Sequence, residues 1–158
     1  MNYLKFSGPG LLLLICCATG FAQEKAIPNV PDYKKPALFV SFPDKIPVDV
    51  NELRSLFSTD AARGNDAVLS FADKKLPGFN GKIVSMSSKY NNSIRSVVIR
   101  STHFNGATLT LSSSTTTDGA ARYTGRIISF QHGDLFVLQK ENEQYYLIKK
   151  KYHELINE

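Results

Sequence analysis

From Ala67 onward the sequence repeats one pattern, in which short segments of alternating apolar and polar residues are separated by turn-forming dipeptides. The clearest segment is Ala107–Ser112 (ATLTLS), where alanine and leucine alternate with hydroxyl side chains. Asn105-Gly106 precedes it and Asp118-Gly119 follows it, and both dipeptides favour hairpin turns. A period of two residues with frequent turns predicts antiparallel strands joined to their neighbours in sequence.

Seven segments carry this strand pattern: Ala67–Phe71, Lys82–Ser87, Ile94–Arg100, Ala107–Ser112, Arg122–Gln131, Asp134–Lys140 and Gln144–Lys150. No alternation of strands with helices occurs, which argues against a doubly wound parallel sheet. We therefore expect a mainly β (β-rich α+β) fold, an antiparallel meander of about six to seven strands forming a curved sheet or partly open barrel.

Three local features refine this expectation. Gly125 interrupts a strand segment and marks a possible bulge. The polar run Ser112–Thr117 is expected to form a solvated hairpin loop. Asn91-Asn92 favours a left-handed turn, and Lys151–Glu158 is expected to end the chain as a short helical turn.

Val48–Ser58 (VDVNELRSLFS) is the one segment with a helical pattern, and we expect an N-terminal amphipathic helix there. Asp49 is the expected N-cap, with Glu52 three residues later as its capping-box partner. The apolar residues expected on one face are Val50, Leu53, Leu56 and Phe57. This helix is expected to cover one face of the sheet or to plug one end.

Residues 1–22 have the layout of a secretory signal peptide. Lys5 precedes the apolar run Leu11–Cys17, and the small-residue signal Gly20–Ala22 predicts cleavage between Ala22 and Gln23. The run is shorter than the roughly 20 apolar residues of a membrane-spanning helix, and no second run of that length follows. We expect an exported protein, periplasmic or extracellular, with no transmembrane span after signal removal.

Cys16 and Cys17 both lie within the signal segment, so cleavage leaves a chain without cysteine. Disulfides, thiol catalysis and thiolate zinc sites are then excluded. Attachment of a lipid to Cys16 or Cys17 is the alternative. It is disfavoured because a small residue is expected before a lipidated cysteine, whereas Ile15 precedes Cys16.

Residues 23–47 contain five of the seven prolines and are expected to be extended and irregular, as a linker to the cleaved end. Ala37–Phe42 is the alternative there, as a short edge strand. Residues 48–158 are expected to form a single β-rich domain. A chain of 158 residues is too short for a TIM barrel, a two-domain dehydrogenase or a kinase. Its net charge of +5 is compatible with an anionic partner but is not concentrated in any stretch.

Catalytic and metal-binding motifs do not occur in the sequence. It has no His-x-His, H-E-x-x-H, G-x-S-x-G, Walker-type or dinucleotide glycine motif, and its acids are scattered over expected loops. We therefore assign no catalytic, cofactor or metal residue. One alternative is a hydrolase whose site is assembled from the distant residues His103, His132 and Asp134.

Aromatic and basic residues interleave near the C-terminus: Tyr145, Tyr146, Lys149, Lys150, Lys151 and Tyr152. Single-stranded nucleic acid binds to such surfaces when the rings are exposed. Strand alternation favours packing of the tyrosines instead, and an exported protein rarely meets nucleic acid, so no nucleic-acid partner is expected.

Four short stretches carry a resemblance to a known family: Gly81–Val84, Ser96–Ser101, Phe104–Ala107 and Tyr145–Ile148. They are somewhat similar to the β-rich pro-segment of secreted zinc metalloproteases. The resemblance implies an inhibitory or folding-assistant role. It rests on β-patterned residues over about half of the chain, and the cysteine-switch residue is absent, so it does not identify a family.

These observations favour an exported, non-catalytic binding or accessory module. Its expected partner is a protein or another cell-envelope component, and a protein ligand reached by an edge strand, or inhibition of a protease, fits this class. A small-molecule carrier with an apolar cavity is a second alternative, next to the hydrolase. The residues that would line its cavity are Phe71, Phe130, Phe136 and Tyr145. The ligand and the oligomeric state stay open.

Overall fold

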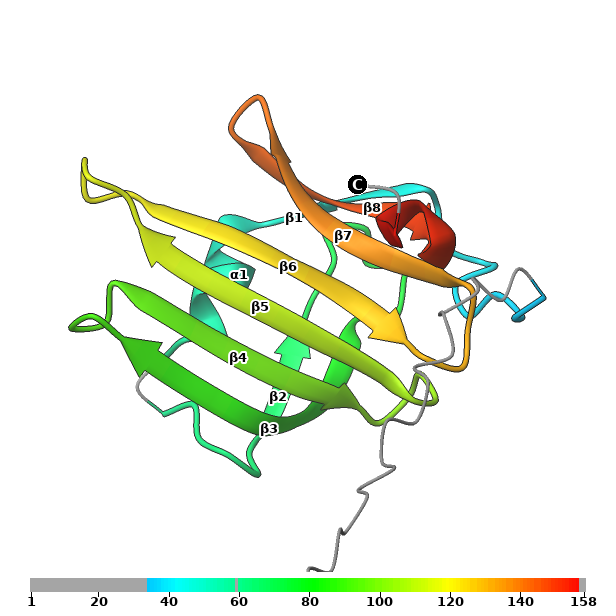
Figure 1. The fold of residues 1–158 in the computed structure, drawn as a ribbon, viewed down its shortest axis with the longest axis horizontal. Helices are drawn as coiled ribbons and strands as arrows, with labels where there is room; N and C mark the ends of the chain where they lie inside the picture. The colour runs from blue at the N-terminus through cyan, green and yellow to red at the C-terminus, as the bar shows by residue number, and fades with distance from the viewer. Residues whose placement is uncertain (1–33, 59, 157–158) are drawn as a thin grey trace, which may run out of the picture. The chain divides into compact units, whose positions relative to one another are not determined.

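The computed structural model describes residues 34–58 and 60–156. This part of the chain forms one antiparallel sheet of eight strands, in the order β1-β8-β7-β6-β5-β4-β3-β2, which curls into a half-barrel (Figure 1). The mainly β fold expected from the sequence is confirmed, with one strand more than expected. The expected cleavage pair Ala22-Gln23 and both Cys16 and Cys17 lie outside the described residues.

The sheet and the helices have the following bounds. The strands are β1 (Lys45–Val48), β2 (Asp66–Leu69), β3 (Phe79–Lys89), β4 (Ile94–Ser101), β5 (Ala107–Thr115), β6 (Ala121–Ser129), β7 (Asp134–Glu141) and β8 (Gln144–Lys151). The helices are α1 (Val50–Ser55) and the 3-10 helix η1 (Tyr152–Ile156). The expected C-terminal helical turn is confirmed by η1.

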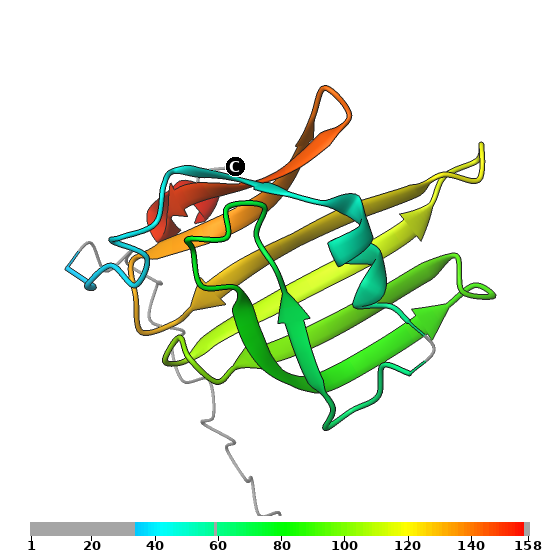
Figure 2. The same cartoon turned by 180° about the vertical axis from the view of Figure 1, so that it is seen from behind.

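Strands β2 to β8 follow one another as a meander, whereas β1 pairs with β8 at the far edge. The chain must therefore cross from one edge of the sheet to the other between β1 and β2. Figure 2 shows that β1, α1 and β2 lie across the concave side of the half-barrel. The Ala72 N–H donates to the Pro47 carbonyl at 3.3 Å, so the two edges approach each other just past the end of β2.

The turns follow from residues that tolerate positive φ. Asn91 and Asn92 have φ values of 52° and 69°, which confirms the expected left-handed turn. Asn142 and Glu143 form the two-residue turn between β7 and β8 with φ values of 47° and 68°. A hairpin of this length needs two such residues, because the primed turn matches the twist of the flanking strands.

The β5–β6 hairpin differs from the expectation, because β5 continues through most of the polar run to Thr115. Ser113 is buried there, and the whole of β5 pairs with β6 without a shift in register. At the tip, the Thr116 hydroxyl and the Ala120 N–H bond the Asp118 carboxylate, and these bonds hold the pKa of Asp118 below its usual range.

The expected bulge at Gly125 is wrong, and the register shift lies instead in β3, between Ile83 and Ser85. The reason for glycine at 125 is close packing. A Cβ atom at this position would lie 2.5 Å from the Thr110 carbonyl oxygen and 3.1 Å from a Leu111 methyl group. Gly125 therefore lets β5 and β6 approach without a kink.

The helix is shorter than the sequence indicates, because Val48 ends β1 and α1 covers only six residues. The Asp49 N-cap is confirmed, and its carboxylate accepts the Asn51 N–H at 2.7 Å. Glu52 does not form the expected capping-box hydrogen bond with the Asp49 N–H. Its carboxylate instead accepts the Ser70 N–H at 3.2 Å, just beyond β2.

The buried face of the helical segment is confirmed for three of its four residues. Leu53, Leu56 and Phe57 are buried, but Val50 is 38% exposed at the first turn. The six-residue helix therefore buries Leu53 against the concave face of the sheet, while Val50 in its first turn stays partly exposed to solvent.

The core fills the concave side of the sheet and extends into the segment that we expected to be a linker. Phe39 and Phe42 are buried within it, and their rings pack with Phe136 at centroid distances of 5.0 and 6.2 Å. Residues 34–44 therefore contribute to the folded domain, although β1, and not Ala37–Phe42, forms the edge strand. The Pro47 carbonyl faces away from β8, and so does the backbone nitrogen of the same residue. Proline, which has no N–H group, therefore costs β1 no hydrogen bond to β8.

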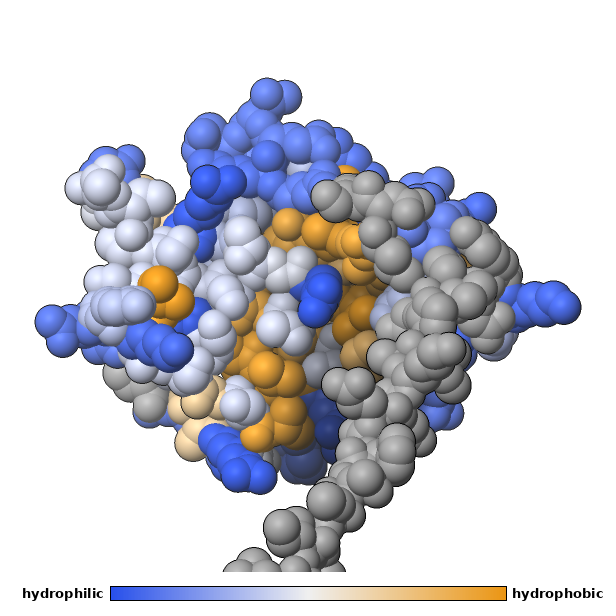
Figure 3. All heavy atoms as spheres, viewed as in Figure 1, coloured by the Kyte–Doolittle hydropathy of each residue, from blue (hydrophilic) through white to orange (hydrophobic). Residues whose placement is uncertain are grey.

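The outer face of the sheet shows apolar surface across the middle of Figure 3, and two further apolar side chains on this face are buried. Ile128 and Leu135 are buried side chains that lie outside the main core cluster. They are paired across β6 and β7 and alternate with the core residues Ile127 and Phe136, which places them on the opposite face.

The close packing at Gly125 leads to a prediction. Gly125→Ala should lower the free energy of unfolding by about 1–3 kcal/mol, because the added methyl group meets backbone that cannot move freely. Thr124 is the exposed neighbour of Gly125 in β6, and Thr124→Ala should lower the free energy of unfolding by less than about 1 kcal/mol. Denaturant unfolding of both variants measures the difference, and equal stabilities would contradict the packing role.

Candidate functional site

The structure does not join the three residues of the hydrolase alternative through their side chains. His132 Nδ1 shares a hydrogen bond with Ser129 Oγ at 2.8 Å, and His103 Nδ1 shares one with Thr102 Oγ1 at 3.2 Å. Asp134 uses its two oxygens to accept backbone N–H groups. No hydrogen bond joins any two of the three side chains in the described part of the chain.

The four aromatic residues proposed to line a carrier cavity divide between the core and the surface. Phe71, Phe136 and Tyr145 are buried in the core cluster, where their rings contact other aromatic rings. Phe130 is 71% exposed, outside the core. The structure therefore places three of these side chains in the core, Phe71 and Phe136 each against Phe42 and Tyr145 against Tyr123.

The C-terminal aromatic and basic residues have structural contacts of their own. Tyr145 is buried, and its hydroxyl accepts the Tyr123 N–H at 3.1 Å where β7 separates from β6. The Tyr146 ring lies beneath the Lys45 ammonium group at 4.1 Å. Strand alternation, the reason for expecting packed tyrosines, is confirmed for Tyr145.

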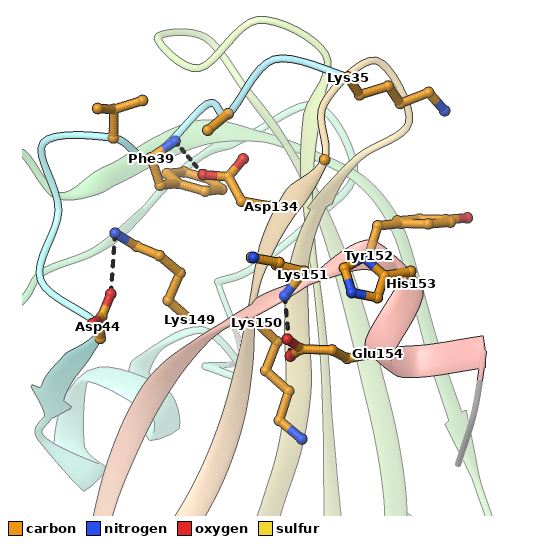
Figure 4. Close-up of a pocket in the computed structure, with 13 residues that line it drawn as sticks. Lys35, Phe39, Asp44, Asp134, Lys149, Lys150, Lys151, Tyr152, His153 and Glu154 are labelled. Carbon is orange, nitrogen blue, oxygen red and sulfur yellow. Dashed lines mark hydrogen bonds and ion pairs between the residues drawn. The ribbon is translucent and has the colours of Figure 1, made fainter. Parts of the chain in front are cut away.

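A cleft of about 560 Å³ opens where residues 35–44 pass the end of β8 and η1 (Figure 4). Its walls carry Lys35, Asp44, Asp134, Lys149, Lys151 and Glu154 among other residues. The backbone closes one side, because the Gly133 N–H donates to Pro36 and the Gly133 carbonyl accepts the Tyr152 N–H at 2.8 Å.

The charged groups of this η1 cleft are held by internal contacts. Asp134, only 7% exposed, accepts the Leu38 and Phe39 N–H groups at 2.6 and 2.7 Å. The Lys149 ammonium donates to the Phe42 carbonyl and lies 3.6 Å from the Asp44 carboxylate. Figure 4 shows the Lys35, Lys149 and Lys150 side chains extending in different directions. Their charges do not converge on one point, and the contacts anchor residues 35–44.

The Asp134 anchor leads to a prediction. Asp134→Asn should lower the free energy of unfolding by about 1–3 kcal/mol, because an amide offers one accepting oxygen where two N–H groups are buried. Asp44→Asn in the same cleft is the control, since Asp44 is exposed and should cost less than about 1 kcal/mol. Denaturant unfolding compares them, and equal losses would contradict the anchoring role of Asp134.

The other notable surface is the open edge of β2. This strand pairs only with β3, and its residues alternate between the core and solvent, with Ala67 and Leu69 buried and Val68 48% exposed. The Ser70 and Ala72 N–H groups point away from β3, toward α1 and β1. By the same alternation, the backbone groups of Asp66 and Val68 face that open side.

Two open clefts flank this edge, and Val68 lines both of them. One, of about 560 Å³, lies between Ser70–Ala72 and the start of α1 at Asp49 and Glu52. The other, of about 350 Å³, lies between Asp66 and the end of α1 at Ser55 and Leu56. We call these two clefts together the α1–β2 groove.

The opposite edge of the sheet is closed at Pro47. Pro47 in β1 has no N–H group to offer, and its carbonyl already accepts the Ala72 N–H. Both edges of the sheet have clefts beside them in the described part of the chain. The cleft at β1, of about 360 Å³, lies at Pro47, which has no free N–H and a bonded carbonyl, whereas the clefts at β2 lie beside the outward backbone groups of Asp66 and Val68.

Sequence reasoning did not locate this groove, although it anticipated an edge strand as a binding element. The order of the strands decides which edge is open, and the pairing of β1 with β8 joins residues about a hundred positions apart in sequence. Glu52 lines this groove, but its spacing from Asp49 indicated a capping box, whereas its carboxylate accepts the Ser70 N–H just beyond β2.

No group of three or more His, Cys, Asp or Glu side chains that could hold a metal ion occurs in residues 34–58 and 60–156. In the same residues, no helix has the length and apolar character needed to cross a membrane.

No known family, characterised protein or solved structure matches this chain. Its function is therefore inferred from its own geometry.

Proposed function

We propose that this protein is an exported, non-catalytic binding module that holds an extended segment of a partner polypeptide against the open edge of β2. The observation that carries the proposal is the position of β2 at the end of the sheet, with the α1–β2 groove along its outer side. The signal-like N-terminal sequence supports export.

The edge of β2 offers main-chain groups for pairing. Asp66 and Val68 each present an N–H and a C=O toward the groove, because the outward N–H groups of Ser70 and Ala72 fix the alternation along β2. An extended peptide recognises such an edge by forming one more antiparallel or parallel ladder. Main-chain bonds then supply affinity, and the walls of the groove select side chains.

The groove limits how much of the partner is held. At one end the Ser70 N–H is bonded to Glu52, and the Ala72 N–H is bonded to Pro47. Pairing is therefore confined to the neighbourhood of Asp66 and Val68. A short site of this kind holds a few residues of the partner, and α1 contacts the side chains that face it.

Val68 provides a variant that tests the edge without removing a bond to β3. Val68→Pro deletes the outward N–H group, and proline is tolerated on the open side of an edge strand. Val68→Ala is the control because it shortens the same side chain but keeps the N–H group. We expect Val68→Pro to weaken peptide binding at least about fivefold relative to Val68→Ala.

The probe is a displayed library of random peptides of about ten residues, selected on the protein purified after export of the full chain. The strongest peptide is then titrated against the unaltered protein and both variants by calorimetry. Equal affinity for the two variants, or failure to select any peptide, would contradict the proposal. Unfolding curves of both variants check that the sheet is intact.

A further inference from the structure

We infer that the segment held by the α1–β2 groove is basic, with lysine or arginine at alternating positions. The inference rests on the proposed function and adds the chemistry of the partner. The charge of the groove is opposite in sign to the net charge of +5 of the whole chain.

Four carboxylates and one ammonium group are among the described residues that line the groove, and a second ammonium group, that of Lys82, pairs with Asp66 from outside it. Asp49 and Glu52 stand at the start of α1, and Asp60 and Asp66 line the other cleft. Lys74 is the only basic residue among those that line either cleft. A groove with this excess of negative charge attracts a cationic segment and repels an acidic one.

Two of these carboxylates are already held in place. Asp49 accepts the Asn51 N–H at 2.7 Å, and Glu52 accepts the Ser70 N–H at 3.2 Å. A carboxylate has about four lone-pair sites, so each can also accept an ammonium or guanidinium group. Little side-chain freedom is then lost when a cation binds, which favours binding at these two positions.

Asp66 extends the negative wall along β2, although Lys82 lies 2.9 Å from its carboxylate. Both side chains of this pair are exposed, and such pairs are weak, so Asp66 can share its oxygens with a partner cation. Because the side chains of a strand alternate, residues two positions apart in the partner face the same wall. Alternating basic residues place their charges along α1.

The probes are two blocked peptides of about six residues, in which valine alternates with lysine in one and with glutamate in the other. At about 50 mM salt, the lysine peptide should bind at least about tenfold more tightly than the glutamate peptide. At about 500 mM salt the difference should shrink to about threefold or less, because exposed charges are screened.

The double variant Asp49→Asn and Glu52→Gln removes two charges but keeps oxygens that can accept the Asn51 and Ser70 N–H groups. We expect it to weaken binding of the lysine peptide at least about fourfold at low salt. Asp118→Asn is the matched control, at the tip of the β5–β6 hairpin outside both clefts, and should leave the affinity unchanged.

The outcomes separate this inference from the proposed function. Equal binding of both peptides, with a loss in Val68→Pro, overturns the inference and leaves edge binding intact. A loss of affinity in Asp118→Asn as large as in the double variant also overturns it, because the attraction would then be non-specific. If neither peptide binds and the library yields none, both proposals fail.

Discussion

The pairing of β1 with β8 is the constraint on which the rest of the structure depends. It places β1 at one edge of the sheet. The meander that follows begins with β2, which lies at the other edge. The connection between them must therefore cross the concave side, and it does so through α1. The helix covers part of the core there and forms one wall of the groove beside β2.

The contacts of residues 35–44 keep β1 in this position. Asp134 holds the backbone at Leu38 and Phe39, and the Phe39 and Phe42 rings fill the core beside Phe136. The η1 cleft is thus best explained as the anchor of the N-terminal segment. The two edges of the sheet then differ, because Pro47 in β1 has no N–H and a bonded carbonyl, while β2 keeps outward backbone groups at Asp66 and Val68.

Local patterns in the sequence predicted most of the sheet, because strand alternation, Asn-Gly and Asn-Asn turns and the Asp49 cap depend on neighbours in the chain. Three features depend on distant contacts and were missed. Position 125 has no room for a side chain larger than that of glycine, because the β5 backbone lies close to it. The Glu52 carboxylate accepts the Ser70 N–H across the groove, and the core includes Phe39 and Phe42. The candidate site belongs to the same class, because strand order alone decides which edge stays open.

The central claim is that a peptide pairs with β2 at Val68, and amide hydrogen exchange at that residue tests it most directly. In the unbound protein the outward Val68 N–H should exchange quickly, as expected for a backbone group at an open edge. A saturating basic peptide should slow this exchange at least about tenfold, because the amide then donates to the added strand. Unchanged exchange at Val68, with protection appearing instead around η1, would contradict the account and place the binding site at the other cleft.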